Sequence, residues 1–256
     1  MNNFNNKNFD SQYSEVYDLI YEQKNYEDEC RRIRKFFVFK DKIQDILELG
    51  CGTCGHTIIF SKSGYLIDAV DKSKKMLDVA RKKIEIQNIK NVNLILSDIY
   101  KLNITKSYDV ILLLFNVVGY LDNFKLFLNL LKKNLKEGSL LIFDFWNKSA
   151  VEKNGPKETI KFFEKNCLKI EKKSIGKIIN EKNSIDIKIE TSLIKEGTKI
   201  SGSKERHLIR YYDLIELQNS LKSEGYELLK FEDFKIPEKK PDDVSWNVFC
   251  VSKFLG

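Results

Sequence analysis

The chain has 256 residues and a mass of 30.0 kDa; 42% of its residues are hydrophobic and 32% are charged. This length allows one or two domains, and the composition is typical of a globular protein with a full core. The 12 glycines and 3 prolines exclude a collagen-like or proline-rich chain. The apolar run 110–115 is far shorter than the about 18 residues of a membrane span, and residues 1–10 lack the apolar core of a signal peptide. We therefore expect a cytoplasmic protein without a membrane partner.

Basic side chains number 44 and acidic side chains 37, a formal net charge of +7. The excess is modest and the lysines are spread along the chain, whereas nucleic-acid-binding domains usually carry a denser basic stripe. We expect most lysines to be solvated, and contact of some of them with phosphate groups stays open.

The cysteines are few, odd in number and scattered, which predicts no disulfide framework: Cys30, Cys51, Cys54, Cys167 and Cys250. Cys51 and Cys54 form a C-x-x-C pair. Zinc would need two further ligands, and of the two histidines only His56 is near. We expect small residues in a tight turn and no metal.

The first 40 residues are predicted to form a helical cap. Apolar side chains at positions 13, 16, 17, 20 and 21 share one helix face, and residues 26–39 predict a second helix. From residue 43, strands and helices alternate, which indicates a parallel sheet covered on both faces. We expect strands at 45–49, 65–70, 92–96, 108–115 and 139–145, and helices at 56–61, 73–87 and 122–135, the last closed by Gly138.

After residue 146 the alternation ends. Residues 168–171, 185–190 and 204–212 alternate in polarity with period two, as in an antiparallel sheet exposed on one side. A helix at 213–223 and a hairpin of strands 226–234 and 246–253 follow. We expect a cap at 1–40, a core at 41–150, an antiparallel layer at 151–212, and a helix with a hairpin at 213–256 that completes the core.

A glycine cluster after the first strand predicts a ligand-binding loop. Gly50, Gly52 and Gly55 satisfy G-x-G-x-x-G between a strand and a helix, where glycines let the backbone turn sharply and approach a ligand. Asp71 ends the second strand, where a carboxylate can accept hydrogen bonds from ribose hydroxyls. The combination indicates a cofactor that contains a nucleoside.

Two further carboxylates and the terminal hairpin argue against a dinucleotide and so against a NAD-dependent dehydrogenase. Glu48 precedes the first glycine by two residues, where it would repel a pyrophosphate and attract a cationic amine. Asp98 follows the third strand and could accept from an adenine amino group.

Segments 46–53 (ILELGCGT), 70–77 (VDKSKKML) and 97–99 (SDI) closely resemble motifs of class I S-adenosylmethionine-dependent methyltransferases, over residues 43–145. The resemblance implies a Rossmann-like α/β sheet of seven strands, six parallel and the last antiparallel. It implies that residues 50–53 bind the methionine part, Asp71 the ribose, and Asp98 with Ile99 the adenine. The whole implied cofactor set is Tyr17, Tyr26, Glu48, Leu49, Gly50, Cys51, Gly52, Thr53, Asp71, Lys72, Met76, Asp98, Ile99, Leu114 and Phe115.

The methyl acceptor is constrained by motifs that are absent. Adenine- and cytosine-N4 DNA methyltransferases carry a D/N/S-P-P-Y/F/W motif after the fourth strand, and segment 114–120 (LFNVVGY) has no proline. The Pro-Cys nucleophile of cytosine-C5 enzymes is missing too. Methylation of nucleic acid is therefore not expected.

Segments 17–29, 115–121 and 143–146 (FDFW) look like those of N-methyltransferases that act on nucleotide-linked amino sugars, which insert an antiparallel layer where residues 160–212 lie. This chain departs from them at Asn116, where serine is common, and at 145–147, where paired tryptophans are common. The resemblance implies that Tyr21 reaches the acceptor amine. An amine must lose its ammonium proton before or during attack, and a tyrosine oxygen, Asp144 or His207 could accept it. Tyr21, Tyr120 and His207 are therefore the candidate catalytic residues, and we expect positioning to dominate. It implies a substrate set of Tyr21, Asn116, Trp146, Asn147, Glu205, Arg210, Trp246 and Asn247.

Several alternatives stay open. Tyr17 and Tyr21 could simply pack the cap, Trp146 could belong to the core, and Arg210 could be a surface cation. The acceptor could be another small metabolite, methylated on nitrogen or oxygen. An RNA-binding protein of methyltransferase fold is a further hypothesis, supported by the net charge alone, and a homodimer is not excluded.

Overall fold

The computed structural model describes residues 9, 11–40, 42–165 and 168–256. The predictions that concern residues 1–8 and Cys167 lie outside these described residues. None of the helices in the described ranges is long and apolar enough to cross a membrane.

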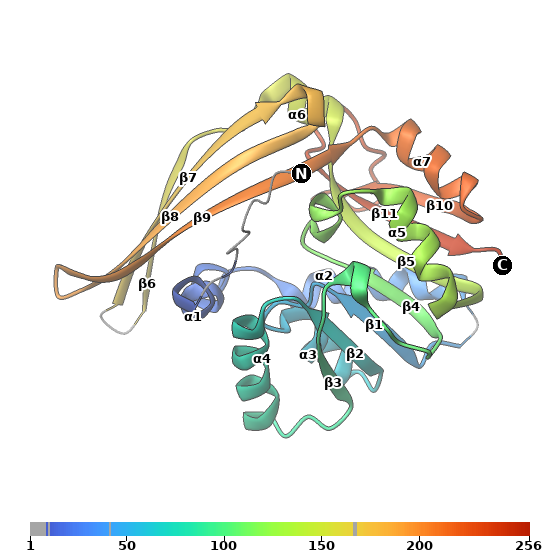
Figure 1. Ribbon diagram of the computed structural model, residues 1–256, viewed down its shortest axis with the longest axis horizontal. Coiled ribbons are helices and arrows are strands. Elements are labelled where there is room, and N and C mark those ends of the chain that lie inside the picture. The colour runs from blue at the N-terminus through green and yellow to red at the C-terminus, as the bar shows by residue number, and fades with distance from the viewer. Residues whose placement is uncertain (1–8, 10, 41, 166–167) are drawn as a thin grey trace.

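Within the described residues, seven strands form the core sheet in the order β3-β2-β1-β4-β5-β11-β10 (Figure 1). Their bounds are β1 Asp45–Leu49, β2 Leu66–Asp71, β3 Val92–Leu96, β4 Tyr108–Leu113, β5 Leu135–Asn147, β10 Tyr226–Asp233 and β11 Asn247–Phe254. Neighbouring pairs from β3 to β5 are parallel, and β11 is antiparallel to both β5 and β10. The predicted seven-stranded sheet with an antiparallel last strand is confirmed.

Helices cover both faces of this sheet, as the alternating pattern predicts. On one face α2 (Tyr26–Lys35), α3 (Gly55–Lys62) and α4 (Lys74–Ile86) pack on one apolar cluster, and on the other face α5 (Phe124–Leu131) and α7 (Leu214–Ser223) pack on a second. The predicted cap of α4 is present, because the Ser73 hydroxyl accepts from the Met76 amide at 3.2 Å. Short 3-10 helices are η1 Phe36–Phe39, η2 Ile99–Lys101, η3 Val117–Tyr120, η4 Lys132–Asn134 and η5 Asn180–Lys182.

Long antiparallel strands form a curved layer that extends away from the core (Figure 1). They run in the order β9-β8-β7-β6, with bounds β6 Thr159–Lys165, β7 Leu168–Ile179, β8 Ser184–Lys195 and β9 Thr198–Tyr212. The layer joins the core where Trp146 and Asn147 of β5 pair with Tyr211 and Tyr212 of β9. Its strands are longer than the predicted ones, and neither β6 nor α6 (Lys148–Asn154) was predicted.

Helix α1 (Ser11–Ile20) lies between the layer and the core, in contact with β6 and β9 on one side and α4 on the other. Figure 1 shows it beneath the curved strands, with α4 below it. Of the predicted helical cap, α1 is thus the part that lies between the two sheets, whereas α2 packs on the core sheet.

The prediction that Gly138 closes a helix at 122–135 is wrong. Helix α5 ends at Leu131 and β5 begins at Leu135, so Gly138, with a φ of +81°, lies inside the strand. The pairing with β4 shifts register between Tyr108–Leu135 and Val110–Leu140. The extra residues on β5 form an irregularity of the β-bulge kind, and Gly138 is the one among them that adopts a left-handed conformation.

Phe127→Ala tests the packing of α5. The Phe127 ring is 1% exposed, whereas the neighbouring Leu126 is 51% exposed. Removing a buried phenylalanine ring costs about 3–5 kcal/mol. We expect that loss in the free energy of unfolding from a denaturant titration, and a change within about 0.5 kcal/mol for Leu126→Ala. Equal losses in the two variants would contradict this orientation of α5.

Candidate functional site

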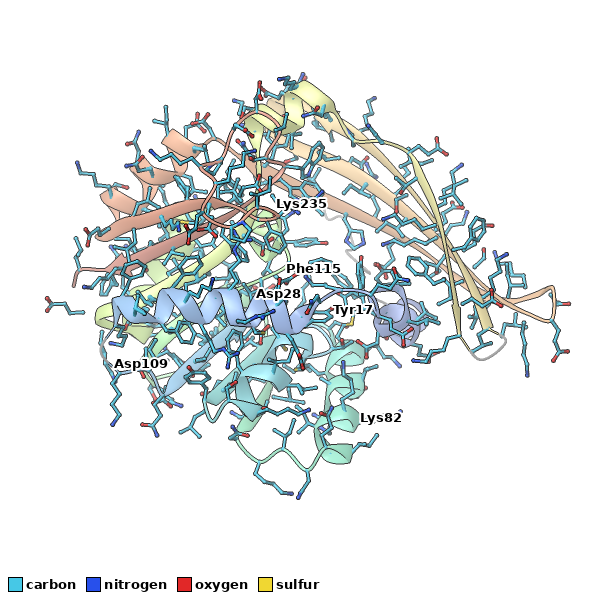
Figure 2. The ribbon with its side chains drawn as sticks, turned by 180° about the vertical axis from the view of Figure 1, so that it is seen from behind. Tyr17, Asp28, Lys82, Asp109, Phe115 and Lys235 are labelled. Atoms are coloured by element: carbon cyan, nitrogen blue, oxygen red, sulfur yellow. The ribbon has the colours of Figure 1, made fainter. Side chains whose placement is uncertain are left out.

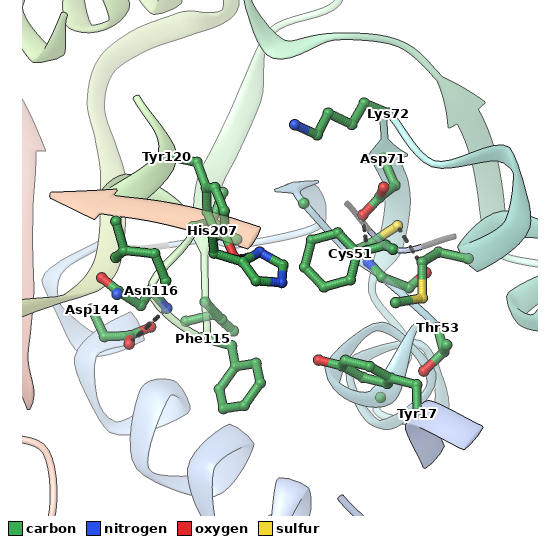
Figure 3. A pocket seen from close by; sticks show the side chains of 18 of the residues that line it. Tyr17, Cys51, Thr53, Asp71, Lys72, Phe115, Asn116, Tyr120, Asp144 and His207 are labelled. Carbon is green, nitrogen blue, oxygen red and sulfur yellow. Dashed lines mark hydrogen bonds between the residues drawn. The ribbon is translucent and has the colours of Figure 1, made fainter. Parts of the chain in front are cut away.

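A cavity of about 480 Å³ lies at the carboxyl ends of β1, β2, β4 and β5, where the core meets α1 and the curved layer. Open α/β sheets bind ligands at this edge, and the volume is in the range of small-molecule sites. Figure 3 shows Cys51, Asp71 and Lys72 on one side of this cavity and Asn116 and Asp144 on the other.

The glycine loop is fixed against the ends of β2 and β4. The amides of Gly50 and Cys51 donate to the Val70 carbonyl at 2.8 and 3.0 Å. Gly50 has a φ of +73°, and a Cβ there would lie 2.6 Å from the Val117 side chain. Gly52 also has a positive φ, but a Cβ on it would meet open space. Backbone conformation and close packing therefore require glycine at position 50, and the loop presents bare backbone to the cavity.

The carboxylate of Asp71 accepts a hydrogen bond from the backbone of this loop. Its Oδ2 accepts from the Gly52 amide at 2.8 Å and its Oδ1 from the Ser73 amide at 2.7 Å. Burial raises the pKa of Asp71, and these backbone donors oppose that rise. Each carboxylate oxygen can accept a second hydrogen bond, so Asp71 can bind a diol.

Glu48 is buried beneath the loop and is held by α3. The Thr57 hydroxyl donates to its Oε2 at 2.5 Å, and burial raises the pKa of Glu48. His56, in the first turn of α3, contacts Glu29 with its Nε2 at 2.8 Å. Lys24 forms an ion pair with the same Glu29. This chain of polar groups ties α2 to the cofactor side of the cavity.

Aromatic rings from α1 and from the loop after β4 form the wall near the glycine loop. The Tyr17 and Tyr21 ring centroids are 4.6 Å apart, and Tyr21 meets Phe115 edge-on at 5.0 Å. Figure 2 labels Tyr17 and Phe115 near the middle of the molecule, where α1 approaches the core. Tyr26 covers Gly55, since a Cβ there would lie 2.6 Å from its ring.

On the layer side, Tyr120, His207 and Glu205 form a hydrogen-bonded row, of which Figure 3 labels Tyr120 and His207. The Tyr120 hydroxyl lies 2.9 Å from His207 Nδ1, and His207 Nε2 lies 3.0 Å from Glu205 Oε2. Tyr120 and His207 line the cavity, whereas Glu205 is buried behind the imidazole. Burial raises the pKa of Tyr120, so its phenol keeps its proton at neutral pH.

Asp144 is a buried carboxyl group at the carboxyl end of β5. Its Oδ2 accepts from the Asn116 amide at 2.9 Å. Burial raises its pKa to about 7, with smaller opposing influences of Lys24, which lowers it, and Glu29, which raises it. An acid with a pKa near neutrality is suited to proton transfer.

Most of the predicted site residues meet in this cavity. Those that line it are Tyr17, Tyr21, Tyr26, Glu48, Gly50, Cys51, Gly52, Thr53, Asp71, Lys72, Met76, Asp98, Ile99, Leu114, Phe115, Asn116, Tyr120, Trp146, His207 and Asn247. Of the predicted residues, all of which are described, Leu49, Asn147, Glu205, Arg210 and Trp246 do not line it. Leu49 lies in the core, Asn147 donates to the Asp242 carbonyl at 2.9 Å, and Trp246 packs on Trp146.

Arg210 lies on the opposite face of β9 from His207. Side chains alternate along a strand, so odd-numbered residues such as Ile209 share the cavity face and Arg210 does not. It lines a second cavity of about 300 Å³ beside α5 and α7, with Lys125 and Glu216. This corrects its predicted placement, and strand parity was the signal that could have separated it from His207.

Sequence reasoning missed the cavity residues contributed by the layer and by the chain ends of other segments: Phe9, Lys172, Ser174, Ile187, Ile189, Ile209 and Phe234. They follow no motif. The curvature of the layer brings those of β7, β8 and β9 to the core, whereas Phe9 precedes α1 and Phe234 follows β10. Among the described residues, no group of three or more His, Cys, Asp or Glu side chains could hold a metal ion.

Comparison with known proteins supports this geometry. Residues 46–138 match the family model described as a methyltransferase domain. This match spans β1 to β4 and the first residues of β5. A curated protein of Papaver bracteatum, named "Probable (S)-tetrahydroprotoberberine N-methyltransferase 2", is 31% identical over 104 residues, which make up 40% of this chain and 28% of that protein. The chain covers only 28% and 41% of the length of the curated relatives that it matches.

Solved structures share the fold over nearly the whole chain. An S-adenosylmethionine-dependent methyltransferase from Clostridium acetobutylicum superposes with a TM-score of 0.80 and 21% identity, over 97% of this chain and 100% of that one. The sugar N-methyltransferase KedS8 from Streptoalloteichus superposes with a TM-score of 0.77 and 15% identity, over 94% and 93%. The predicted Rossmann-like fold of S-adenosylmethionine-dependent methyltransferases is confirmed.

The cavity residues fit this cofactor. Gly52 leaves open space beside bare backbone, and the Asp71 carboxylate can accept from ribose hydroxyls. Asp98 accepts from the Tyr100 amide with Oδ1 at 2.8 Å and lines the cavity beside Ile99, where an adenine would fit. The carboxyl groups of Glu48 and Asp71 favour a cationic ligand over a pyrophosphate.

Asp71→Asn tests the ribose contact. Hydrogen bonds to a charged group contribute about 1.5–3 kcal/mol, so we expect the affinity for S-adenosylhomocysteine to fall by tenfold or more in calorimetry. The ligand-induced rise in melting temperature should fall with it. Asp78→Asn, on the exposed side of α4, is the matched control and should bind as the wild type does. An unchanged affinity in Asp71→Asn would remove the ribose assignment.

Asp144→Asn tests the raised pKa. An unfolded aspartate ionises near pH 4, whereas the folded Asp144 keeps its proton up to about pH 7. The native state thus binds the extra proton, and wild-type stability falls as pH rises from 4 to 7. Asparagine cannot ionise, so the stability of the variant relative to the wild type should rise over this interval by about 3–4 kcal/mol. A difference independent of pH would contradict the raised pKa.

Proposed function

We propose that the protein transfers a methyl group from S-adenosylmethionine to the amino nitrogen of a small molecule, most specifically the amine of a sugar linked to a nucleotide of the dTDP or UDP type. The observation that carries this proposal is the continuity of the cavity. It runs from the glycine loop and Asp71 to a wall formed by β7, β8 and β9, including Ser174, Ile189 and His207. One end suits the cofactor, and the other has room for an acceptor.

The nature of the similar proteins supports an amine acceptor. The sugar N-methyltransferase KedS8 shares the curved layer as well as the core, since the superposition covers 94% of this chain. The tetrahydroprotoberberine N-methyltransferase also has a nitrogen acceptor by its name. Nitrogen methylation is therefore favoured over oxygen methylation.

Cations on the cavity wall support a phosphate-bearing acceptor. Lys172 of β7 donates to the Tyr21 hydroxyl at 3.0 Å, and Lys72 lies 5.9 Å from the centre of the Tyr120 ring. Both lysines line the cavity. A diphosphate between sugar and nucleoside could pair with ammonium groups in these positions.

The cofactor, when bound, supplies a methyl group attached to a cationic sulfur, which an amine lone pair attacks in line. The chain has to hold the amine on that line and keep water out. Phe115 and Tyr21 form an apolar wall beside the glycine loop, and α1 closes the cavity from the layer side. The Thr53 hydroxyl donates to Asp18 of α1 at 2.6 Å, which ties this helix to the loop.

The row of Tyr120, His207 and Glu205 orients the acceptor. When the Glu205 carboxylate accepts from His207 Nε2, His207 Nδ1 is left to accept from the Tyr120 hydroxyl. The phenol oxygen is then fixed with its lone pairs available to a substrate donor. We propose that these groups and Tyr21 act mainly by positioning.

The purified protein, incubated with labelled S-adenosylmethionine and a panel of nucleotide-linked amino sugars, should give an N-methylated product detected by mass spectrometry. The matched panel carries a hydroxyl in place of the amino group and should remain unmethylated. Methylation of the hydroxyl compounds alone would contradict the nitrogen acceptor. Methylation only of amines without a nucleotide would retain the reaction and overturn the nucleotide-linked acceptor.

Tyr21→Phe, Tyr120→Phe and His207→Ala measure the contribution of positioning. A required general base contributes about 10²–10⁴-fold, so we expect each substitution to lower kcat less than a thousandfold while S-adenosylhomocysteine affinity stays unchanged. A greater loss in one variant, with binding intact, would identify that side chain as an indispensable base.

A further inference from the structure

Unpaired polar atoms gather at one place on the cavity wall. Among the described residues, Asn116 Nδ2, Asn116 Oδ1, Asp144 Oδ1 and Asn247 Oδ1 are buried and have no hydrogen-bond partner. All three residues line the cavity, and Asn116 and Asp144 are 7% and 2% exposed. Leaving a buried polar group unpaired costs about 1–3 kcal/mol. This cluster therefore lowers the free energy of unfolding, and hydrogen bonds to a bound group would offset that loss.

The strand register explains why the three residues meet. Asn247 of β11 pairs with Trp146 of β5, and Trp146 and Asp144 are two residues apart on one face. Asn247 is therefore a diagonal neighbour of Asp144 on that face. Asn116 is brought to the same point because its backbone N–H donates to Asp144 Oδ2 at 2.9 Å (Figure 3).

The backbone of the turn after β4, which positions Asn116, is strained. Phe115 and Asn116 have φ values of +67° and +59°, and a left-handed conformation is unusual for a bulky residue such as Phe115. A Cβ on Gly119 would lie 3.1 Å from both amide atoms of Asn116 and 2.5 Å from Ile209. The Asn116 side chain is thus packed in place, and strain of this kind is typical of functional sites.

The chemistry of the cluster selects its ligand. Acceptor oxygens outnumber donors, and one acceptor is a carboxyl group that is ionised above about pH 7. No cation among the described residues lies within ion-pair distance of Asp144. Lys24, the cation that lowers the pKa of Asp144, is paired with Glu29. A phosphate would be repelled here. A cation with several N–H donors fits, and the rings of Phe115 and Trp146 on the cavity wall suit it too.

We propose that Asp144, Asn116 and Asn247 form the subsite that binds the ammonium group of the methyl acceptor, and that Asp144 takes a proton from it. This inference rests on the proposed function and names the residues that would receive the amine. None of the three belongs to the row of Tyr120 and His207, so the amine and the remainder of the acceptor have separate contacts.

The proton and electron pairs balance in this scheme. The acceptor enters as R–NH3⁺, and the Asp144 carboxylate takes one proton to give a carboxylic acid and R–NH2. Hydrogen bonds from the two remaining N–H groups to acceptor oxygens leave the lone pair directed toward the open cavity. The lone pair forms the new N–C bond as the C–S bond breaks, and that bond's electrons stay on sulfur. The product R–NH2⁺–CH3 leaves, and Asp144 returns its proton to water.

Two small cations test the subsite without any turnover. The carboxyl carbon resonance of Asp144 is observed by NMR in aspartate-labelled protein and assigned by its absence in Asp144→Asn. Methylammonium, with three N–H donors, should shift this resonance in a saturable way and lower its titration midpoint. Tetramethylammonium has the same charge and no N–H donor, and should have no comparable effect. The measurement is repeated with saturating S-adenosylhomocysteine, and the methylammonium response should persist.

Three outcomes would overturn the proposal. No response to either cation would mean that ordered water alone satisfies the cluster. Equal responses would mean that charge alone is sensed. Loss of the methylammonium response on addition of S-adenosylhomocysteine would assign Asp144 to the cofactor's own amino group. None of these measurements requires a methylated product, so they are decisive even where the proposed activity fails.

Turnover gives the second test once the panel has identified a methylated amine. Asparagine retains the acceptor for the Asn116 amide but cannot take a proton, so Asp144→Asn should lower kcat by about 10²–10³-fold and leave S-adenosylhomocysteine affinity unchanged. In the wild-type protein, kcat/KM should rise with pH to a plateau above about pH 7, and Asp144→Asn should lack this rise. Lys24 and Glu29, the charged groups that influence Asp144, are left unmutated in both proteins. Asp78→Asn is the control. Wild-type kcat and pH profile in Asp144→Asn would contradict the role in proton transfer.

Discussion

The hydrogen bond between Asp71 and the glycine loop is the constraint on which the site depends. Asp71 accepts from the Gly52 amide and so fixes the loop between the ends of β2 and β4. Gly50 can then pack directly against Val117, the first residue of η3. The loop that would bind the cofactor and the turn that would bind the acceptor thus touch each other, and their separation is fixed by packed backbone.

The second sheet closes the cavity from the opposite side. The β9 strand enters the core through two paired residues at the end of β5 and extends outward with His207 and Ile209 on the cavity face. Helix α1 fills the angle between the sheets, and Asp18 ties it to Thr53 and to Lys83.

Acidic and basic side chains lie at different places along the cavity. Carboxyl groups at positions 48, 71 and 144 lie at the carboxyl ends of β1, β2 and β5, while Lys172 lies on β7 of the layer and Lys72 follows Asp71. The carboxyl groups have raised pKa values because burial disfavours their charged form. Such groups lower the stability of the empty protein and gain by binding a cation, which is consistent with two cationic partners, a sulfonium and an ammonium.

The sequence by itself determined the core: the period of its strands and helices, the positive-φ glycines of the loop and the carboxylates at strand ends are local features that hold wherever such a sheet forms. It also singled out Tyr120 and His207 as candidate catalytic residues, but not the contact between them. Strand parity in the sequence already separates Arg210 from His207. Which face of β9 lines the cavity, and the bulge that takes Gly138 into β5, could not be determined because both depend on pairing with distant strands. Only the tertiary structure brought Asn116, Asp144 and Asn247 together, since their meeting depends on the register of β11 on β5 and on a strained turn that no local pattern encodes.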